Sequence, residues 1–448
     1  MTRTPHRGKV IWALATSLAV LLAGCSSDDS PSGGGAASPE ALDAALEKGG
    51  TITYWSWTPS GEEQAAAFEK KYSNVKVEFV NVGTGEDHYT ALQNAIKAGR
   101  GGPDVAQVEY RALPQFALQG SLVDLTGYGF EDLEDDYTAS TWESVHVGEG
   151  IYGLPQDSGP MAMFYNKEVF TRYGVAVPTT WAEYVAAAQK LHAADPTKYI
   201  ASDAGDAGFT TSLIWQAGGR PFTTEGDRDV SVNLQDEGTK KWTAVWNQLI
   251  EGRLVTNITG WTDEWYRALG DGTIATVVAG AWMPGILMDS VQAASGKWAV
   301  APIPTYDGGE PTTAEHGGST QSVLEQSDNP DLAAAFVRWL NNEQDSIDVF
   351  LASGGFPATK ADLESSEFQS FSSPYFGGQK INEVLTTAAT QVSAGWEYLP
   401  YQLYAETIFS DTAGQAYVNN TDLNTGLRAW QDSLVEYGNQ QGFSVNAG

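Results

Sequence analysis

Several aromatic and carboxylate side chains stand where short apolar segments end, and these residues are the best suited to ligand chemistry. An aromatic ring can stack on the apolar face of a sugar, while planar polar groups can bond its hydroxyl edge. Two carboxylates held apart in one site could instead act as the acid and the base of glycoside hydrolysis. The candidate ligand-binding residues at such positions are Trp57, Glu109, Tyr110, Asp157, Trp282, Gly317, Trp396 and Tyr398.

The first of these candidates follow two strand-like segments. Trp57 comes directly after the β-rich segment 51–55, where it either faces a ligand or packs in the core. Trp55 shares the same strand face and is a weaker candidate. Glu109 and Tyr110 come at the end of the next apolar strand pattern. Glu109 either accepts hydroxyl groups of a ligand or is an exposed loop acid.

Three candidates lie in the middle of the chain. Asp157 follows the pair Leu154-Pro155, where it either meets a ligand or caps local structure. Trp282 follows an apolar strand pattern and a small residue pair. Gly317 has no side chain, so the backbone there could approach a ligand closely, although an ordinary loop would also use glycine.

The last candidates, Trp396 and Tyr398, precede a Leu-Pro pair near the C-terminus. Trp215 lies near two glycines and could face a ligand or pack inside the fold. The other tryptophans with a clear pattern recur at helical spacing, which is typical of core positions. They are Trp181, Trp242, Trp246 and Trp339.

Sequence motifs for several other chemistries are missing. The chain has no G-x-x-x-x-G-K-[ST] phosphate-binding loop, no H-E-x-x-H and no G-x-S-x-G. Its five histidines include no pair at the spacing of helical metal ligands, and one cysteine cannot build a Cys-rich metal site. We therefore expect no cofactor and no metal. The acidic run 131–136 is typical of a solvated face.

Composition and charge exclude further classes of function. The 448 residues are 42% hydrophobic, which is enough for a sizeable core. The chain has 25 Lys and Arg against 56 Asp and Glu, and a net charge of −31. Nucleic acids and anionic lipid surfaces both require clustered cations, so neither is an expected partner. Copies of so acidic a chain repel one another, and we expect a monomer.

The N-terminus has the pattern of an export signal. Cations precede the apolar run 10–22, which is too short for a membrane-spanning helix. The segment 22–25, Leu-Ala-Gly-Cys, resembles a bacterial lipobox, which implies lipidation of Cys25; the alternative is an ordinary signal peptide with a chance cysteine. We assign 1–24 to the signal peptide. The small and polar residues that follow predict a lipid-anchored flexible tether over 25–49.

The rest of the chain alternates strand and helix patterns. Residues 51–55 and 75–79 read as strands joined by a helix, and 103–108 reads as the next strand. Thr180 and Glu183 have the spacing of a capping box at a helix start. Repeated strand–helix units predict an α/β fold with a mostly parallel sheet. The last hundred residues look largely helical.

An ordered set of short segments covers nearly the whole chain after the tether. The segments are 53–57 (TYWSW), 102–105 (GPDV), 120–125 (GSLVDL), 152–155 (YGLP), 164–167 (FYNK), 178–183 (PTTWAE), 272–275 (GTIA), 280–282 (GAW), 301–304 (APIP) and 333–340. In this order they resemble the extracellular solute-binding proteins of ATP-binding-cassette (ABC) importers. The resemblance is to the sugar-binding family that includes the maltose-binding protein.

The resemblance implies an α/β fold of two lobes, similar to periplasmic binding proteins, with hinge crossings and a ligand cleft between the lobes. In that family, the tryptophan in the place of Trp282 commonly lines the cleft, and the second lobe contributes a stacking aromatic near Trp396. The predicted crossings lie near 156–158, 301–304 and 356–360. Lobe one is then 50–157 plus 303–356, and lobe two is 158–302 plus 357–448.

The resemblance also implies a function. The chain would be a lipid-anchored extracellular receptor for a carbohydrate, most simply an oligosaccharide, at the outer face of the cell membrane. It would deliver the sugar to the permease subunits of an ABC importer and would not be an enzyme. Two alternatives stay open: an extracellular glycosidase, and a receptor for a non-sugar solute such as a polyamine or iron.

Overall fold

The computed structural model describes residues 37–448, with the exception of positions 227, 307 and 308. The predicted signal peptide and Cys25 lie outside the described residues, so the lipobox stays a prediction. Within the described part of the chain, no helix is both long and apolar enough to cross a bilayer.

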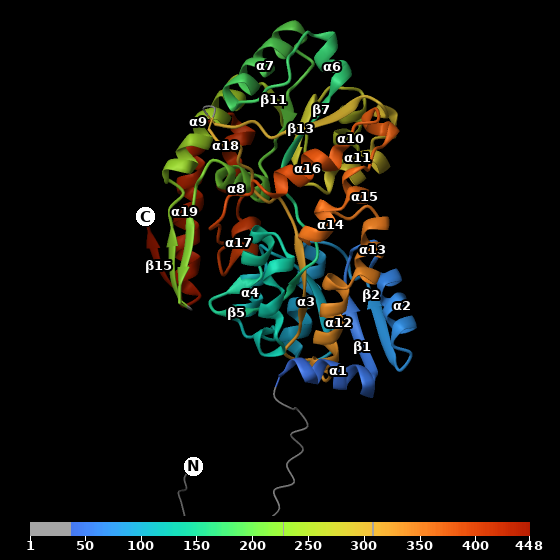
Figure 1. Ribbon diagram of the computed structural model, residues 1–448. Helices are drawn as coiled ribbons and strands as arrows, with labels where there is room; N and C mark the ends of the chain where they lie inside the picture. The colour runs from blue at the N-terminus through green and yellow to red at the C-terminus, as the bar shows by residue number, and fades with distance from the viewer. Residues whose placement is uncertain (1–36, 227, 307–308) are drawn as a thin grey trace, which may run out of the picture. The chain divides into compact units, whose positions relative to one another are not determined.

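The end of the predicted tether is helical. Helix α1 (Pro39–Lys48) begins after Ser38, whose side chain caps the first turn. Leu42 on its inner face is 3% exposed, and α1 packs against α12 (Pro330–Asn342) at the foot of the molecule (Figure 1). The prediction of a flexible segment through residue 49 is therefore wrong for 39–48, because an apolar helix face docks there.

Lobe one is built on a five-stranded sheet with the order β2-β1-β3-β14-β6. Strand β1 pairs in parallel with β2 and β3, as the strand–helix pattern predicts, whereas β14 runs antiparallel to β3 and β6. The strands are β1 (Gly50–Trp55), β2 (Val75–Val80), β3 (Val105–Glu109), β14 (Ser319–Val323) and β6 (Leu154–Pro155). The sheet is thus completed by a strand that returns late in the chain.

Helices cover this sheet and bury the first hydrophobic core, in which Ile52, Val105, Val108 and Phe336 are fully buried. Helix α12 contacts β14, β6 and β1 directly. The other helices of lobe one are α2 (Gly61–Lys71), α3 (Glu86–Ala98), α4 (Leu113–Leu118), α5 (Ala139–Glu143), α13 (Gln344–Ala352) and the 3-10 turns η1 (Thr126–Tyr128) and η2 (Phe130–Asp136). A short hairpin pairs β4 (His146–Val147) with β5 (Gly150–Ile151).

The central sheet of lobe two has the order β12-β7-β13 and is antiparallel throughout. The expected mostly parallel sheet is wrong for this lobe, because β7 lies between β12 and β13 and runs opposite to both, although a helical connection joins β12 to β13. Side chains of β7 alternate between two cores: Met163 lies in one, and Ala162 and Phe164 lie in the other. The strands are β7 (Ala162–Asn166), β12 (Thr276–Ala279) and β13 (Trp298–Pro302).

Two small sheets and most of the late helices complete lobe two. The smaller strands are β8 (Ala201–Ser202), β11 (Val255–Thr256), β9 (Phe222–Glu225), β10 (Asp229–Val232) and β15 (Ser444–Ala447). The helices are α6 (Lys167–Arg172), α7 (Trp181–Ala194), α8 (Ala207–Gln216), α9 (Glu237–Glu251), α10 (Asp263–Gly270), α11 (Met283–Ser290), η3 (Gln292–Ala294), α14 (Lys360–Glu364), α15 (Ser366–Gln369), η4 (Pro374–Phe376), α16 (Ile381–Ala389), α17 (Gln402–Thr407), α18 (Gly414–Asn419) and α19 (Leu423–Gln440). In Figure 1 most of these elements lie above those of lobe one, α17 lies between the two groups, and β15 with the end of α19 extends down at the left.

The predicted capping box at the start of α7 is confirmed at its N-cap. The Thr180 hydroxyl accepts the Glu183 N–H at 3.2 Å. The Glu183 carboxylate bonds the N–H of Thr179 at 2.8 Å rather than that of the N-cap residue itself. Local hydrogen bonds of this kind depend on a few neighbouring residues, which is why sequence spacing predicts them.

Three chain segments meet between the lobes. Asp157 bridges to Pro357, and Pro160 bridges to Glu315. The segment predicted to cross at 301–304 instead ends β13 inside the sheet of lobe two, and Ala314 is buried in a core of that lobe. That crossing prediction is wrong, since the chain packs against lobe two until residue 315 before it enters β14. The exact lobe boundaries stay a prediction.

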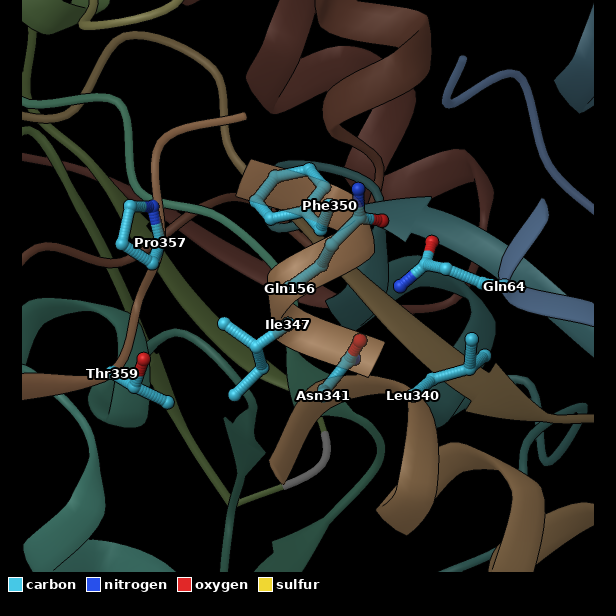
Figure 2. A pocket seen from close by; sticks show the side chains of 8 residues that line it. All are labelled: Gln64, Gln156, Leu340, Asn341, Ile347, Phe350, Pro357 and Thr359. Carbon is cyan, nitrogen blue, oxygen red and sulfur yellow. The ribbon is translucent and has the colours of Figure 1, made fainter. Parts of the chain in front are cut away.

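The junction of the crossing segments encloses a small cavity of about 10 Å³. Figure 2 shows the side chains around it, among them Gln64, Gln156 and Asn341. The Asn341 amide donates to the Leu154 carbonyl at 2.6 Å, and the Gln156 amide donates to the Thr58 hydroxyl at 2.8 Å. A buried, polar and nearly filled junction of this kind holds the crossing strands in a fixed register.

Candidate functional site

Asp157 and Tyr110 meet at the crossing segments. The Tyr110 hydroxyl donates to the Asp157 carbonyl at 2.8 Å, and an Asp157 carboxylate oxygen accepts the Ser319 N–H at 2.6 Å. Tyr110 is only 1% exposed, because its ring lies beneath Gly318, where an added Cβ would come within 2.5 Å of it. Tyr110 therefore has no free face for a ligand and supports Asp157, whereas the half-buried Asp157 remains accessible.

Arg111 forms a charged cluster with two glutamates at the end of β3. Its guanidinium donates to Glu109 at 2.7 Å and also pairs with Glu406 of α17, and all three side chains are about one-fifth exposed. The Tyr89 hydroxyl donates to Glu109 at 2.9 Å, and the guanidinium stands 5.5 Å from the Tyr89 ring centre. Because Glu406 lies on α17, the cluster joins lobe one to lobe two.

Arg111 and Glu406 were not among the sequence candidates. Arg111 could have been found, since it follows the candidates Glu109 and Tyr110 at a strand end. Glu406 could not, because nothing in its helix pattern indicates that α17 faces the other lobe.

Burial raises the pKa of two carboxyl groups at the junction. Desolvation, with the nearby charges of Glu315 and Glu109, raises the pKa of Asp157 to about 7, against the lowering effect of its bond from Ser319. Desolvation likewise raises the pKa of Glu406 to about 7, although the Arg111 charge opposes the shift. Both groups therefore change charge near neutral pH.

Glu315 is a third buried carboxyl group and was also missed by the sequence analysis. It is 1% exposed and accepts hydrogen bonds from Ser140 at 2.8 Å, Ser158 at 3.0 Å and the Gly159 N–H at 2.5 Å. Desolvation raises its pKa to about 6, against the effect of these bonds. Since Ser140 belongs to α5 of lobe one, Glu315 ties that helix to the crossing segments.

Trp282 is docked on the same crossing segment. Its indole Nε1 donates to the His316 carbonyl at 2.6 Å, and the two rings lie 5.5 Å apart. Close packing requires glycine around it: an added Cβ at Gly280 would lie 2.5 Å from Nε1, and one at Gly317 would lie 3.0 Å from it. Gly317 also has φ of +84°, which favours glycine. The half-buried indole is thus fixed by its edge.

Trp57 lies on the lobe-one side of the junction. Its backbone N–H donates to Gln107 at 3.1 Å, and its ring lies 4.7 Å from His88 and 6.4 Å from Tyr89. Trp55 is also near His88, at 6.5 Å. His88 is fully buried, so desolvation lowers its pKa to about 4 and keeps the ring neutral.

Trp396 lies on the lobe-two side, and Tyr398 beside it reaches the core of lobe one. Trp396 stacks on Trp215 with ring centres 5.1 Å apart and an interplanar angle of 7°. Tyr398 meets Trp396 edge-on at 5.9 Å and packs against the core of lobe one. Trp215 is 3% exposed, so it is a core residue that supports Trp396. The helical tryptophans predicted as core are confirmed, with Trp181, Trp242, Trp246 and Trp339 at most 3% exposed.

The contacts described above link several of the sequence candidates around one junction. Trp57 reaches Glu109 through Tyr89, and Glu109 reaches lobe two through Arg111. Aromatic faces stand beside paired and unpaired polar groups, which suits a ligand with apolar faces and hydroxyl edges. Among residues 37–448, excluding the three undescribed positions, no group of His, Cys, Asp and Glu is arranged to hold a metal ion.

Comparison with known proteins gives the family of the chain. Residues 54–346 match the family model of the bacterial extracellular solute-binding proteins. An ABC-transporter-associated binding protein from B. animalis subsp. lactis, solved with β-1,6-galactobiose, is 43% identical; the match covers 88% of this chain and 99% of that one, with a TM-score of 0.79.

Two further relatives are more distant. A galacto-N-biose and lacto-N-biose I-binding protein from Bifidobacterium longum is 28% identical, covering 89% of this chain and 99% of that one, with a TM-score of 0.78. An arabinooligosaccharide-binding protein from Bacillus subtilis is 25% identical over 78% of this chain and 79% of that one. The matched segment spans most of the chain and the two-lobe fold is shared. This chain belongs to the bacterial extracellular solute-binding proteins, in the group of sugar-binding receptors of ABC importers.

Proposed function

We propose that this chain binds an oligosaccharide at the junction between its lobes and delivers it to an ABC importer. One observation carries the proposal: an aromatic ring and planar polar groups occur at the same junction. The ring is Trp282, which is held by its edge, and the polar groups are Asp157 and the Arg111 cluster. The indole offers an apolar face, and the carboxylates and guanidinium offer acceptors and donors for hydroxyl groups.

The test is titration calorimetry with a panel of sugars chosen from the relatives. β-1,6-Galactobiose, lacto-N-biose and an arabino-oligosaccharide represent sugars that related receptors bind. At least one is expected to bind with a defined stoichiometry of one sugar per chain. If none of these sugars, nor lactose or a maltodextrin, gives binding heat at millimolar concentration, the proposal fails.

The same chain is proposed to perform no hydrolysis. A glycosidase needs one carboxyl group free to protonate a leaving group and a second free to attack or to activate water. Glu315 is enclosed by three hydrogen-bond donors, and Glu109 and Glu406 share one guanidinium. Incubation of the binding sugar with the protein, followed by product analysis, should return the sugar intact.

A polyamine receptor is the alternative with some structural support, because several carboxyl groups surround the junction. Arg111 opposes it, since its guanidinium already pairs with two of these groups. Spermidine therefore belongs in the binding panel. Binding of spermidine together with failure of every sugar would favour this alternative. Iron is disfavoured by the buried, hydrogen-bonded hydroxyl of Tyr110.

We also propose that the receptor is anchored outside the cell by a lipid on Cys25. The support is the lipobox pattern at 22–25 and the small polar residues after it. Cys25→Ala should abolish metabolic lipid labelling and release the protein from the envelope. An unlabelled variant that stays with the membrane would contradict the assignment.

Ligand binding is expected to favour a closed arrangement of the lobes, as in a two-state hinge equilibrium. Small-angle scattering should then give a smaller radius of gyration with saturating sugar. An unchanged scattering curve at saturation would exclude a hinge movement of this kind while leaving the binding result intact.

A further inference from the structure

Trp261 differs from every other tryptophan in the described part of the chain. It is 53% exposed, whereas the remaining described tryptophans are buried or half-buried. Its φ is +67°, in the left-handed region that side chains other than glycine rarely adopt. A large apolar ring in a strained and exposed position is unfavourable for folding alone, and such strain is concentrated at functional sites.

The chain holds Trp261 firmly in that position. Trp261 directly precedes Thr262, the N-cap of α10, whose hydroxyl accepts the Trp265 N–H at 3.3 Å. The same hydroxyl donates to the Thr259 carbonyl at 2.8 Å, which closes the turn around Trp261. The indole therefore projects from a fixed turn.

Trp261 extends the aromatic surface of Trp282 outward. The two ring centres lie 5.6 Å apart at an interplanar angle of 42°, and Trp265 supports Trp261 from behind at 5.2 Å. Since Trp282 is itself docked on His316, Trp282 and Trp261 lead from the crossing segment to the surface, while Trp265 is buried beside Trp261. Neighbouring sugar rings of an oligosaccharide are inclined to each other and lie at a spacing similar to that of these two indoles. The inclined rings of Trp261 and Trp282 therefore match a pair of neighbouring sugars.

The surroundings favour a sugar over a protein partner or a lipid. Among the described residues, the other exposed large apolar side chains, Val80, Val177, Phe371 and Val418, belong to neither α10 nor α11, so these two helices add no second fully exposed apolar side chain to Trp261. The exposed residues that follow it, Asp263 and Glu264, offer acceptors for hydroxyl groups.

We propose that Trp261 is the platform of an outer saccharide subsite, which binds the sugar residue next to the one on Trp282. The inference rests on the proposed oligosaccharide function and makes it more specific. The ligands are then chains of at least two residues, and the second residue adds affinity by stacking on Trp261. A role limited to supporting Trp282, or to closing the start of α10, is the competing explanation.

The test compares galactose with β-1,6-galactobiose, using calorimetry for the tight complex and saturation-transfer NMR titration for the weak one. Variants are Trp261→Ala, the conservative Trp261→Phe, and Phe371→Ala as a control that also truncates an exposed aromatic. Trp261→Ala should weaken galactobiose binding roughly 5–150-fold, by analogy with the loss of one stacking platform. The dissociation constant of galactose should change less than about twofold in Trp261→Ala. Trp261→Phe should recover part of the lost affinity for galactobiose.

Three other results would overturn the proposal. Equal losses for galactose and galactobiose would make Trp261 a positioning residue for Trp282. Unchanged affinity for both, or a melting temperature well below that of Phe371→Ala, would assign Trp261 to the start of α10. If wild-type protein binds no sugar of the wider panel, the oligosaccharide function itself fails. If it binds an oligosaccharide other than galactobiose, the same comparison is made with that oligosaccharide and its constituent monosaccharide.

Discussion

The two sides of the junction differ in their main chemistry, although lobe one also carries Trp57 and lobe two also carries Glu406. Lobe one contributes Glu109, Arg111 and Tyr89, which are joined by charged and neutral hydrogen bonds at the end of β3. Lobe two contributes aromatic rings, with Trp282 and Trp261 on one side and Trp396 on the other. The hydrogen bonds of the polar side are directional, and its members are bonded to one another. On the aromatic side, Trp261 is exposed and Trp282 and Trp396 are half-buried.

This difference separates two tasks. Hydrogen bonds to buried groups fix geometry, because a displaced partner leaves an unsatisfied charge. Aromatic faces tolerate displacement, because stacking depends on area and only weakly on direction. We therefore expect changes on the polar side to appear first in stability and in the contact between the lobes. Changes on the aromatic side should appear first in affinity.

The largest expected effect is on the polar side. Arg111→Met leaves Glu109 and Glu406 without their shared cation, and breaking a largely buried pair costs on the order of 3 kcal/mol of unfolding free energy. Chemical denaturation of wild type and variant measures this loss.

Lys71→Met is the matched control, because Lys71 also pairs with two acids, Glu343 and Asp345, but at the surface. Exposed pairs contribute at most about 1 kcal/mol, so the control should stay close to wild type. Equal losses in the two variants would mean that the Arg111 cluster behaves as a surface pair.

The next effect tests the aromatic side. Trp282→Ala removes a proposed platform and should weaken oligosaccharide binding roughly 5–150-fold, which corresponds to about 1–3 kcal/mol. A melting curve is recorded beside the binding isotherm for the same variant. Lost stability of about 3–5 kcal/mol with intact affinity would make Trp282 a core residue instead.

A third effect concerns pH and Glu315. Its pKa is raised from the ordinary 4.5 to about 6, so the folded state holds the proton more tightly than the unfolded state. The contribution of Glu315 to stability is therefore greatest below about pH 4.5 and is lost as the pH rises through 6, by on the order of 2 kcal/mol. Denaturation of wild type and Glu315→Gln across this window measures it.

Other groups titrate in the same pH range. The quantity to compare is therefore the difference in unfolding free energy between wild type and Glu315→Gln at each pH. His88, with its pKa lowered to about 4, has the opposite sign: its neutral form is favoured in the folded state, so its contribution grows as the pH rises. A constant difference between wild type and Glu315→Gln from pH 4.5 to 6 would contradict the assignment to Glu315.

The smallest effect tests how tightly Trp282 is held. An added Cβ at Gly280 would lie 2.4 Å from the His316 carbonyl and 2.5 Å from the indole nitrogen, so Gly280→Ala should displace the ring. We expect about 1 kcal/mol of lost binding free energy, measured by calorimetry. Gly285→Ala, in α11 with open space around it, should leave affinity unchanged and raise stability by about 0.5–1 kcal/mol.

Local features of the fold could be predicted from sequence. The strands at 51–55 and 75–79 and the N-cap Thr180 lie as predicted, because each depends on residues close in the chain. The docking of α1 and the antiparallel sheet of lobe two could not be predicted in this way. Both depend on which distant surface an apolar face finds, and periodicity does not specify the partner.

Some residues of the candidate site could likewise be predicted from the sequence, and others could not. Trp57, Glu109, Asp157 and Trp282 could be singled out because polar and aromatic residues at strand ends tend to meet at one edge. Glu315 and Glu406 were missed, since their burial and partners come from segments far away in sequence. Trp261 was also missed, because neither its exposure nor its left-handed backbone follows from the residues next to it.

The sequence by itself therefore determined the export signal pattern, the alternating elements, the core tryptophans and the residue types at the junction. These follow from composition, period and spacing, which are properties of neighbouring residues. Only the tertiary structure decided that Tyr110 is buried, that Arg111 pairs across the lobes, and that Trp261 lies beside Trp282. The reason is physical: exposure, ion pairing and ring contact depend on which residues far apart in the chain come together when the cores close.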